Sequence, residues 1–132
     1  HPHVIQPVEW IGDTIVFYSL GNFVSAQLQD QNYNKMVGLM SSLTITKTVK
    51  GDDVKISIGD VKNELIFTYY NKSTWRNFKV IPFSNENIGK YLNTYNKVYE
   101  TYKKVVTNLD EDMYVVPVYG TVEESNSTET EN

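Results

Sequence analysis

The sequence predicts an α+β protein that is rich in β-strand, with a hairpin, an antiparallel meander and one long C-terminal amphipathic helix. Short runs of β-branched and aromatic residues, separated by turn residues, fill the first 82 positions. From residue 84 onward, apolar residues instead recur at spacings of three and four. The 132 residues are 40% hydrophobic and 13% aromatic, which is enough to build a core.

The first predicted element is a β-hairpin formed by Val4–Ile11 and Thr14–Ser19. Pro7 cannot donate to a strand ladder, so we expect the first of these strands at an edge. The second is a near-continuous β-branched and aromatic run, which is typical of a strand buried on both faces. Gly21-Asn22 ends this run, and the dipeptide favours a positive φ or a close approach of the backbone to a ligand.

An antiparallel meander with one solvated face is predicted for the middle of the chain. It follows a polar segment, Ser25–Lys35, that we interpret as a surface loop. Alternating apolar and polar residues indicate half-buried strands. The predicted strands are Met36–Thr48, Asp53–Val61, Glu64–Tyr70 and Phe78–Pro82.

A helix is predicted to begin at a cap formed by Ser84 or Asn85. Its apolar stripe is about 18 residues long and runs from Ile88 to Val106, so packing against the core is the favoured interpretation and a coiled coil or partner helix the alternative. Four tyrosines lie on this stripe and could form a carbohydrate-binding platform, although helical spacing favours the core. They are Tyr91, Tyr95, Tyr99 and Tyr102.

The charge distribution separates the body of the chain from its C-terminal end. Residues 1–108 carry 12 basic and 9 acidic side chains, a net charge of +3, whereas residues 109–132 carry 7 acidic and no basic ones. Met113–Tyr119 is a last strand-like segment, interrupted by Pro117. We therefore expect one domain portion over 1–119 and a disordered acidic tail over 120–132. The lysines and arginines form no cluster of the kind that binds nucleic acid.

Candidate chemistry is concentrated near the N-terminus, where both histidines of the chain lie. His1 and His3 are two residues apart, so their side chains share a face of an extended chain and could bind one metal ion or one ion each of a pair. From spacing alone, a solvated terminal pair is the favoured interpretation. Glu9 and Asp13 lie near the hairpin, where a carboxylate is usually just solvated. The sequence contains no P-loop, Gly-rich dinucleotide motif or Ser-His-Asp pattern, and no cysteine.

Taken together, the first 25 residues resemble a known family. The segment HPHVIQPVEW, followed after a short turn by YSLGNFV, is similar to the C-terminal signature of bacterial poly-γ-glutamate capsule synthesis proteins of the CapA type. That family is a branch of the calcineurin-like metallophosphatases. The matching residues are His1, Pro2, His3, Val4, Gln6, Pro7, Glu9, Tyr18, Ser19, Leu20, Gly21, Asn22 and Phe23. Beyond them the likeness is general: a β-rich region followed by a helix.

The resemblance implies that the complete domain is a four-layer α/β/β/α sandwich with a dinuclear metal centre at the strand ends. His1 and His3 fall on the His-x-His motif of that superfamily and would be metal ligands. The metals would be a divalent pair, Mn, Fe or Zn, in the full-length parent. Asn22 is the candidate for a residue that supports a ligand or faces the substrate, and Glu9 is a weaker candidate.

The metal-ligand motifs that precede the His-x-His motif in this superfamily do not occur in the chain. We therefore expect a fragment that is inactive alone and holds no metal, with the missing N-terminal part of the same domain as its first partner. The parent would act at the bacterial cell surface, membrane-anchored or extracellular, with membrane-bound capsule synthesis proteins and an anionic polymer as partners and no nucleic acid. Two alternatives remain open: a non-enzymatic envelope scaffold or binding module with a vestigial metal site, and a true metal-dependent phosphoesterase or other hydrolase in the full-length parent.

Overall fold

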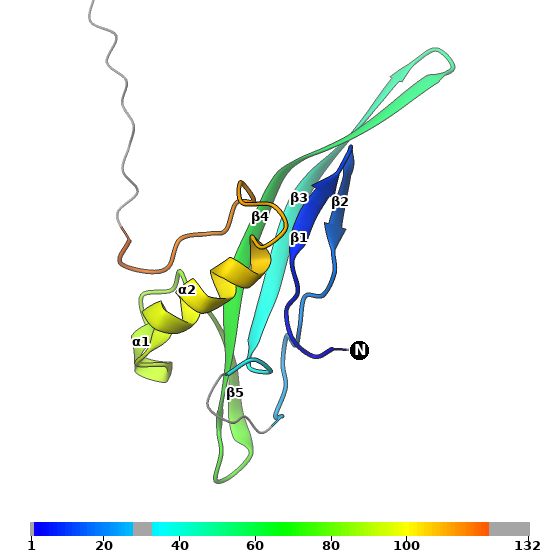
Figure 1. Cartoon of the computed structure of the whole chain (residues 1–132). Helices are drawn as coiled ribbons and strands as arrows, with labels where there is room; N and C mark the ends of the chain where they lie inside the picture. The colour runs from blue at the N-terminus through cyan, green and yellow to red at the C-terminus, as the bar shows by residue number, and fades with distance from the viewer. Residues whose placement is uncertain (1, 28–32, 122–132) are drawn as a thin grey trace, which may run out of the picture.

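A computed structural model describes residues 2–27 and 33–121 of the chain. Strands β1 (Val8–Ile11) and β2 (Thr14–Phe17) form a two-stranded antiparallel hairpin. A second sheet has the order β3-β4-β5 and is antiparallel throughout. Figure 1 shows the helices on one side of this sheet and the β1–β2 hairpin on the other side of the view. The β-rich, hairpin-plus-meander part of the predicted fold class is confirmed.

The N-terminal hairpin is shorter than predicted but has the expected turn. Val8 pairs with Phe17 and Ile11 with Thr14, and Gly12 occupies the turn at a φ of +59°. Antiparallel pairing resumes beyond the hairpin with a bridge between Ile5 and Leu20. The hairpin therefore extends past Pro7 into a longer antiparallel ribbon, in which residues 5–11 run beside residues 14–20.

The three-stranded sheet consists of β3 (Val37–Lys50), β4 (Asp53–Asn71) and β5 (Arg76–Pro82). The sequence predicted two strands where β4 is one strand of 19 residues. The register shifts between Ser42 and Thr44, where Asp60 adopts a φ of +51°. This β-bulge absorbs the extra residue and bends the strand, so β4 continues where its pattern suggested a break.

The hydrophobic core lies between the inner half of this sheet and the helices. It includes side chains from Ile5 to Val118, so the N-terminal and C-terminal segments share one core. The outer half of the β3–β4 hairpin projects beyond the rest of the molecule as a two-stranded arm (Figure 1). Its β-branched side chains are exposed, as in Ile45 and Ile56 at 65% and 64% of their surface.

The prediction of one long helix is wrong, because the apolar stripe is divided between two helices. These are α1 (Ile88–Tyr91) and α2 (Tyr95–Val106). Leu92 leaves the helical conformation at φ −145° and ψ 95°, and its side chain is buried in the same core as Ile88. The predicted caps are also absent: Asn85 accepts a hydrogen bond from the backbone of Asn87, before the helix begins. The apolar side chains of the predicted stripe thus remain in the core, although the backbone changes direction between α1 and α2.

The segment after α2 packs on the sheet without forming a strand of its own. Val115 makes one parallel bridge to Asn63, and the backbone N–H of Tyr119 donates to Phe83 O at 2.9 Å. The tail expected to be disordered lies mostly outside the described residues, which end at Thr121. In the described ranges, no helix is long and apolar enough to cross a membrane.

Candidate functional site

The fold brings together two of the residues singled out from the sequence, His3 and Asn22. His3 precedes β1 and Asn22 follows β2, so the antiparallel ribbon places them opposite each other. The backbone N–H of Gln6 donates to Ser19 O at 3.0 Å within this ribbon. At its end, His3 Nδ1 lies 2.9 Å from Asn22 Oδ1. The side-chain pair is therefore a product of the pairing between residues 19 positions apart.

A second hydrogen bond fixes the orientation of the Asn22 amide. Asn22 Nδ2 donates to the backbone carbonyl of Lys35 at 3.0 Å. Because a carbonyl oxygen can only accept, the amide nitrogen must face Lys35 and the amide oxygen must face His3. His3 Nδ1 then carries the proton, and in the neutral ring the lone pair lies on Nε2. This is the arrangement in which a neighbouring acceptor sets the tautomer of a metal-binding histidine.

The backbone around this pair is unusually close and strained. His3 has a φ of 55°, in the left-handed region that non-glycine residues rarely adopt, and Gly21 has a φ of 67°. A Cβ on Gly21 would lie 3.0 Å from Ile5, and one on Gly38 would lie 2.2 Å from Asn22 O. The positive φ that Gly21-Asn22 predicted is confirmed at Gly21. The close approach is to the backbone of β3.

Further contacts attach the segment after β2 to the three-stranded sheet. The backbone N–H of Leu39 donates to Leu20 O at 2.8 Å, and Thr68 Oγ1 donates to Phe23 O at the same distance. Thr68 is fully buried. The sheet therefore holds Asn22 from both sides of its position in the chain.

Glu9 and Asp13 are not part of this pair. The hydroxyl of Tyr18 donates to Glu9 Oε1 at 2.6 Å, and this bond to a carboxylate raises the pKa of Tyr18. Glu9 lies within β1, and Asp13 is exposed at the hairpin turn. Glu9 thus orients an exposed tyrosine across the hairpin.

The other predicted metal ligand, His1, lies outside the described residues. Over residues 2–27 and 33–121, no group of three or more histidine, aspartate or glutamate side chains is placed to hold a metal ion. His3 and Asn22 therefore fit a ligand and its support, but the described residues do not complete a metal centre.

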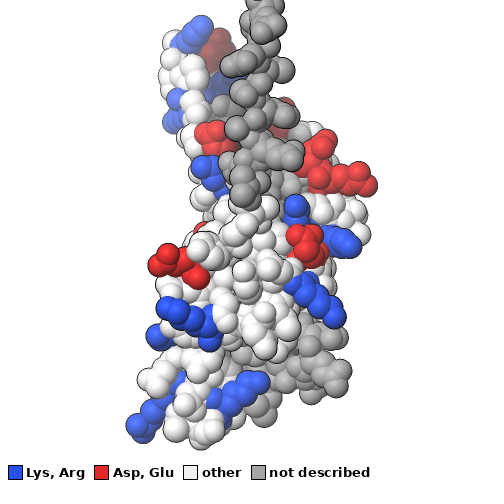
Figure 2. All heavy atoms as spheres, turned by 90° about the vertical axis from the view of Figure 1, so that its left-hand side faces the viewer, with Lys and Arg blue, Asp and Glu red and all other residues white. Residues whose placement is uncertain are grey.

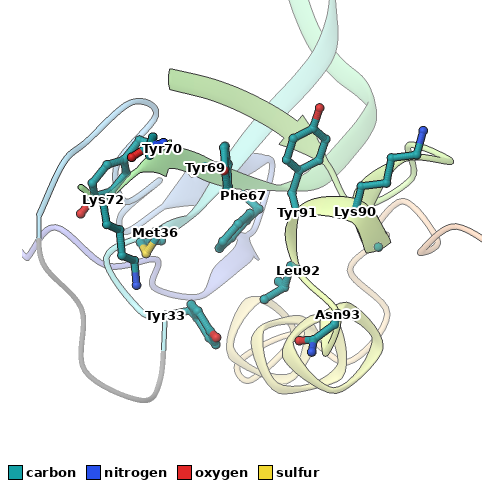
Figure 3. A pocket seen from close by; sticks show the side chains of 12 residues that line it. Tyr33, Met36, Phe67, Tyr69, Tyr70, Lys72, Lys90, Tyr91, Leu92 and Asn93 are labelled. Carbon is teal, nitrogen blue, oxygen red and sulfur yellow. The ribbon is translucent and has the colours of Figure 1, made fainter. Parts of the chain in front are cut away.

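A concave surface, the aromatic groove, lies on the helix side of the sheet, and the sequence patterns did not reveal it. It has a volume of about 550 Å³ and lies between the end of β4 and α1. Figure 3 shows Tyr33, Tyr69 and Tyr91 around it. Of the tyrosines predicted as a ladder, Tyr99 and Tyr102 are buried in the core. The groove instead draws tyrosines from three separate segments, so no local period could have indicated it.

Comparison with known proteins identifies the N-terminal segment. A family described as "Bacterial capsule synthesis protein PGA_cap" matches residues 1–27. Residues 1–27 are therefore similar to a bacterial capsule synthesis family. The PGA biosynthesis protein CapA of Bacillus subtilis (strain 168) is 59% identical over 27 residues, which are 20% of this chain and 7% of that relative. No solved structure matches the chain significantly.

The matched segment contains the side chains that the sequence singled out and the structure describes. His3, Glu9, Asn22 and the strained Gly21 all lie within the matched 27 residues. The resemblance to CapA-type proteins that the sequence suggested is confirmed for this segment. The three-stranded sheet, both helices and the aromatic groove all lie beyond it.

Proposed function

We propose that this chain is the C-terminal part of a CapA-type capsule synthesis protein, in which His3 is a metal ligand and Asn22 holds it in the binding tautomer. The observation that carries the proposal is the pair of hydrogen bonds from Lys35 O through Asn22 to His3. A surface histidine needs no such support, whereas a histidine ligand almost always has one.

The remaining ligands belong to parts of the parent protein other than the described residues. His1 is the second ligand of this segment, and the other ligands come from the N-terminal part of the same domain, folded as an α/β/β/α sandwich. The parent holds a pair of divalent ions, Mn, Fe or Zn, while this chain alone holds none firmly. Such a centre would supply an activated water and neutralise negative charge.

In the proposed setting, the parent acts at the bacterial cell surface in the synthesis or export of poly-γ-glutamate. Its partners are membrane-bound capsule synthesis proteins and the anionic polymer itself. The name of the Bacillus subtilis relative, PGA biosynthesis protein CapA, supports this role.

The metal proposal is tested by calorimetric titration of Mn²⁺ and Zn²⁺ into this chain and into the longer parent protein. We expect the chain alone to bind more weakly than micromolar. We expect the parent to bind tightly and to lose about 10- to 100-fold in affinity with Asn22→Ala, the range reported for residues that support metal ligands. Gln6→Ala is the matched control, because Gln6 is exposed and contributes only its backbone N–H to the ribbon.

Two results would contradict this proposal. One is micromolar or tighter binding by the chain alone that His1→Ala abolishes, since the site would then be complete without the rest of the parent. The other is an unchanged affinity of the parent after Asn22→Ala. Separately, a phosphomonoester assay of the parent with added Mn²⁺ distinguishes a phosphoesterase from a scaffold, for which turnover stays at the metal-free background.

A further inference from the structure

We propose that the aromatic groove between β4 and α1 binds an acidic saccharide chain, that is, a glycan whose repeat unit carries a carboxylate. This goes beyond the proposed metal site, which belongs to the ribbon of the N-terminal segment. The inference rests on the shape of the groove, on its tyrosines and on its charge.

The shape of the groove suits an extended ligand. Its volume of about 550 Å³ lies within the range of ordinary small-molecule sites. A second concavity of about 590 Å³ continues along α2, and the two share Tyr33. The combined surface runs from the end of β4 past α1 to the flank of α2 that carries Lys97 and Thr101, so it offers adjacent positions for linked units.

Three half-buried tyrosines give the groove both apolar rings and hydroxyl groups. They are Tyr33, Tyr69 and Tyr91. Tyr33 packs edge-on against Phe67 at 5.9 Å, and the rings of Tyr69 and Tyr91 lie 5.1 Å apart. These contacts fix the rings before a ligand arrives, which lowers the entropy cost of binding. A tyrosine ring with its hydroxyl matches a sugar, which also has apolar C–H faces and hydroxyl edges.

The charge of the groove selects an anionic ligand. Lys72 and Lys90 lie on opposite sides of it (Figure 3), and Lys97 lies in its continuation along α2. Among the described residues that line either concavity there is no aspartate or glutamate. Lys90 Nζ donates to the neutral amide oxygen of Asn87 at 2.5 Å, so its charge is not compensated by that contact.

The surroundings of the groove have the same sign. Residues 67–93 contain four basic side chains and a single acidic one, Glu86. Figure 2 shows lysine and arginine side chains over the lower end of this face, without acidic side chains among them. Lys79 donates to the hydroxyl of Tyr91 at 3.0 Å, and this bond raises the pKa of Lys79. The cation therefore stays charged while it supports a ring of the groove.

The spacing of the cations favours a saccharide over the other polyanions. The lysines of the groove are few and separated by tyrosines, which matches one carboxylate per repeat unit with rings between. A glutamate polymer carries carboxylates but has no ring for the tyrosines to contact. A nucleic acid carries a phosphate charge on every nucleotide, whereas the lysines that line the two concavities are only three.

The proposal is tested by titrating the complete 132-residue chain with four probes, followed by NMR and calorimetry. The probes are a hyaluronan oligosaccharide, a neutral dextran oligosaccharide, poly-γ-glutamate and a single-stranded DNA oligonucleotide. We expect saturable binding of the hyaluronan oligosaccharide that weakens with salt, and shifts in the signals of Tyr33 and Tyr91. Exposed charges carry little folding energy, so Lys72→Ala and Lys90→Ala are expected to fold normally and each to weaken binding about tenfold.

Lys55→Ala is the matched control, because Lys55 is an equally exposed lysine on the projecting arm. His3→Ala should leave saccharide binding unchanged, so the groove and the proposed metal site can fail independently. The proposal is overturned if no saccharide binds, if the neutral oligosaccharide binds as well as the acidic one, or if poly-γ-glutamate or DNA binds more tightly. Equal binding by Lys90→Ala and Lys55→Ala would also overturn it.

Discussion

At the scale of single residues, Asn22 is the position on which the N-terminal site depends. Its side chain joins His3 to the backbone of Lys35, and its own carbonyl lies against Gly38 of β3. Only a residue without a Cβ fits at position 38, because an added Cβ would lie 2.2 Å from Asn22 O. The geometry of the histidine thus depends on a glycine in another sheet.

The first residue-scale prediction concerns Gly38. We expect Gly38→Ala to displace the Asn22 backbone and to destabilise the protein by about 1–3 kcal/mol, the usual cost of overpacking. Urea unfolding measures the loss, and the ¹⁵N shifts of the His3 ring report whether the Nδ1–H tautomer is lost. Gly59→Ala is the control, since a Cβ there meets nothing within 4 Å. Equal effects of the two substitutions would contradict the close packing at Gly38.

At the scale of elements, α2 shows how the core uses tyrosine. Tyr99 and Tyr102 are 2% and 7% exposed. The hydroxyl of Tyr99 donates to Val116 O at 3.0 Å, which joins α2 to the C-terminal segment. Burial, followed by the nearby Glu100 carboxylate, raises the pKa of Tyr99 to about 12, and burial also raises the pKa of Tyr102. The folded state therefore favours the neutral phenol.

This element predicts a loss of stability at alkaline pH. Because the pKa of Tyr99 rises from 10.0 to about 12 on folding, its contribution is fully present below pH 10 and is lost as pH rises toward 12. The loss should be on the order of 2 kcal/mol. Urea unfolding at pH 9 and at pH 11.5 measures it.

Two tyrosine variants isolate the contribution of Tyr99. Tyr99→Phe should be less stable at pH 9, since it lacks the hydrogen bond to Val116, but should lose less stability on going to pH 11.5. A smaller decline remains because Tyr102 titrates in the same direction. Tyr119→Phe, at a ring that is 47% exposed, should keep the wild-type decline. An unchanged decline in Tyr99→Phe would contradict the assignment.

At the scale of the whole molecule, both terminal segments are attached to the β3–β4 hairpin. Asn63 is the central connection on the C-terminal side and is fully buried. It accepts from Ser41 Oγ at 2.7 Å and donates to Tyr114 O at 3.0 Å, and its own carbonyl accepts from the backbone of Val116. The side chain of Asn63 thus joins β4 to the C-terminal segment, 51 positions further along the chain.

Removing this connection should loosen the molecule at one end first. Asn63→Ala removes both side-chain hydrogen bonds of a fully buried residue and leaves its part-buried partners unpaired, so we expect a loss of about 2–4 kcal/mol. Hydrogen exchange should quicken across 113–119 before the rest of the sheet. Asn96→Ala, at an exposed position of α2, is the control and should change stability by less than about 0.5 kcal/mol. Uniformly faster exchange over the whole sheet would contradict a local role for Asn63.

The amino-acid pattern by itself determined the class of the elements and the family of the first segment. Alternating residues marked the strands, and spacings of three and four marked the stripe from Ile88 to Val106, because side-chain burial repeats with the backbone period. The motif residues of His1–Ser25 indicated a resemblance to capsule synthesis proteins, which the family match over residues 1–27 confirmed. Periodicity carries no information on contacts between segments. It therefore missed the break in the helix at Leu92, and it predicted two strands where β4 is a single strand.

Only the tertiary structure decided which of the functional side chains lie close together. Pairing across the ribbon places Asn22 on His3 and leaves Glu9 on Tyr18, although all four lie in the same short segment. Folding of β4 against α1 gathers the tyrosines of the groove from positions 33, 69 and 91. The physical reason is the same in both cases. Which side chains come into contact depends on how the backbone folds back on itself, and the strand register and the core packing determine that.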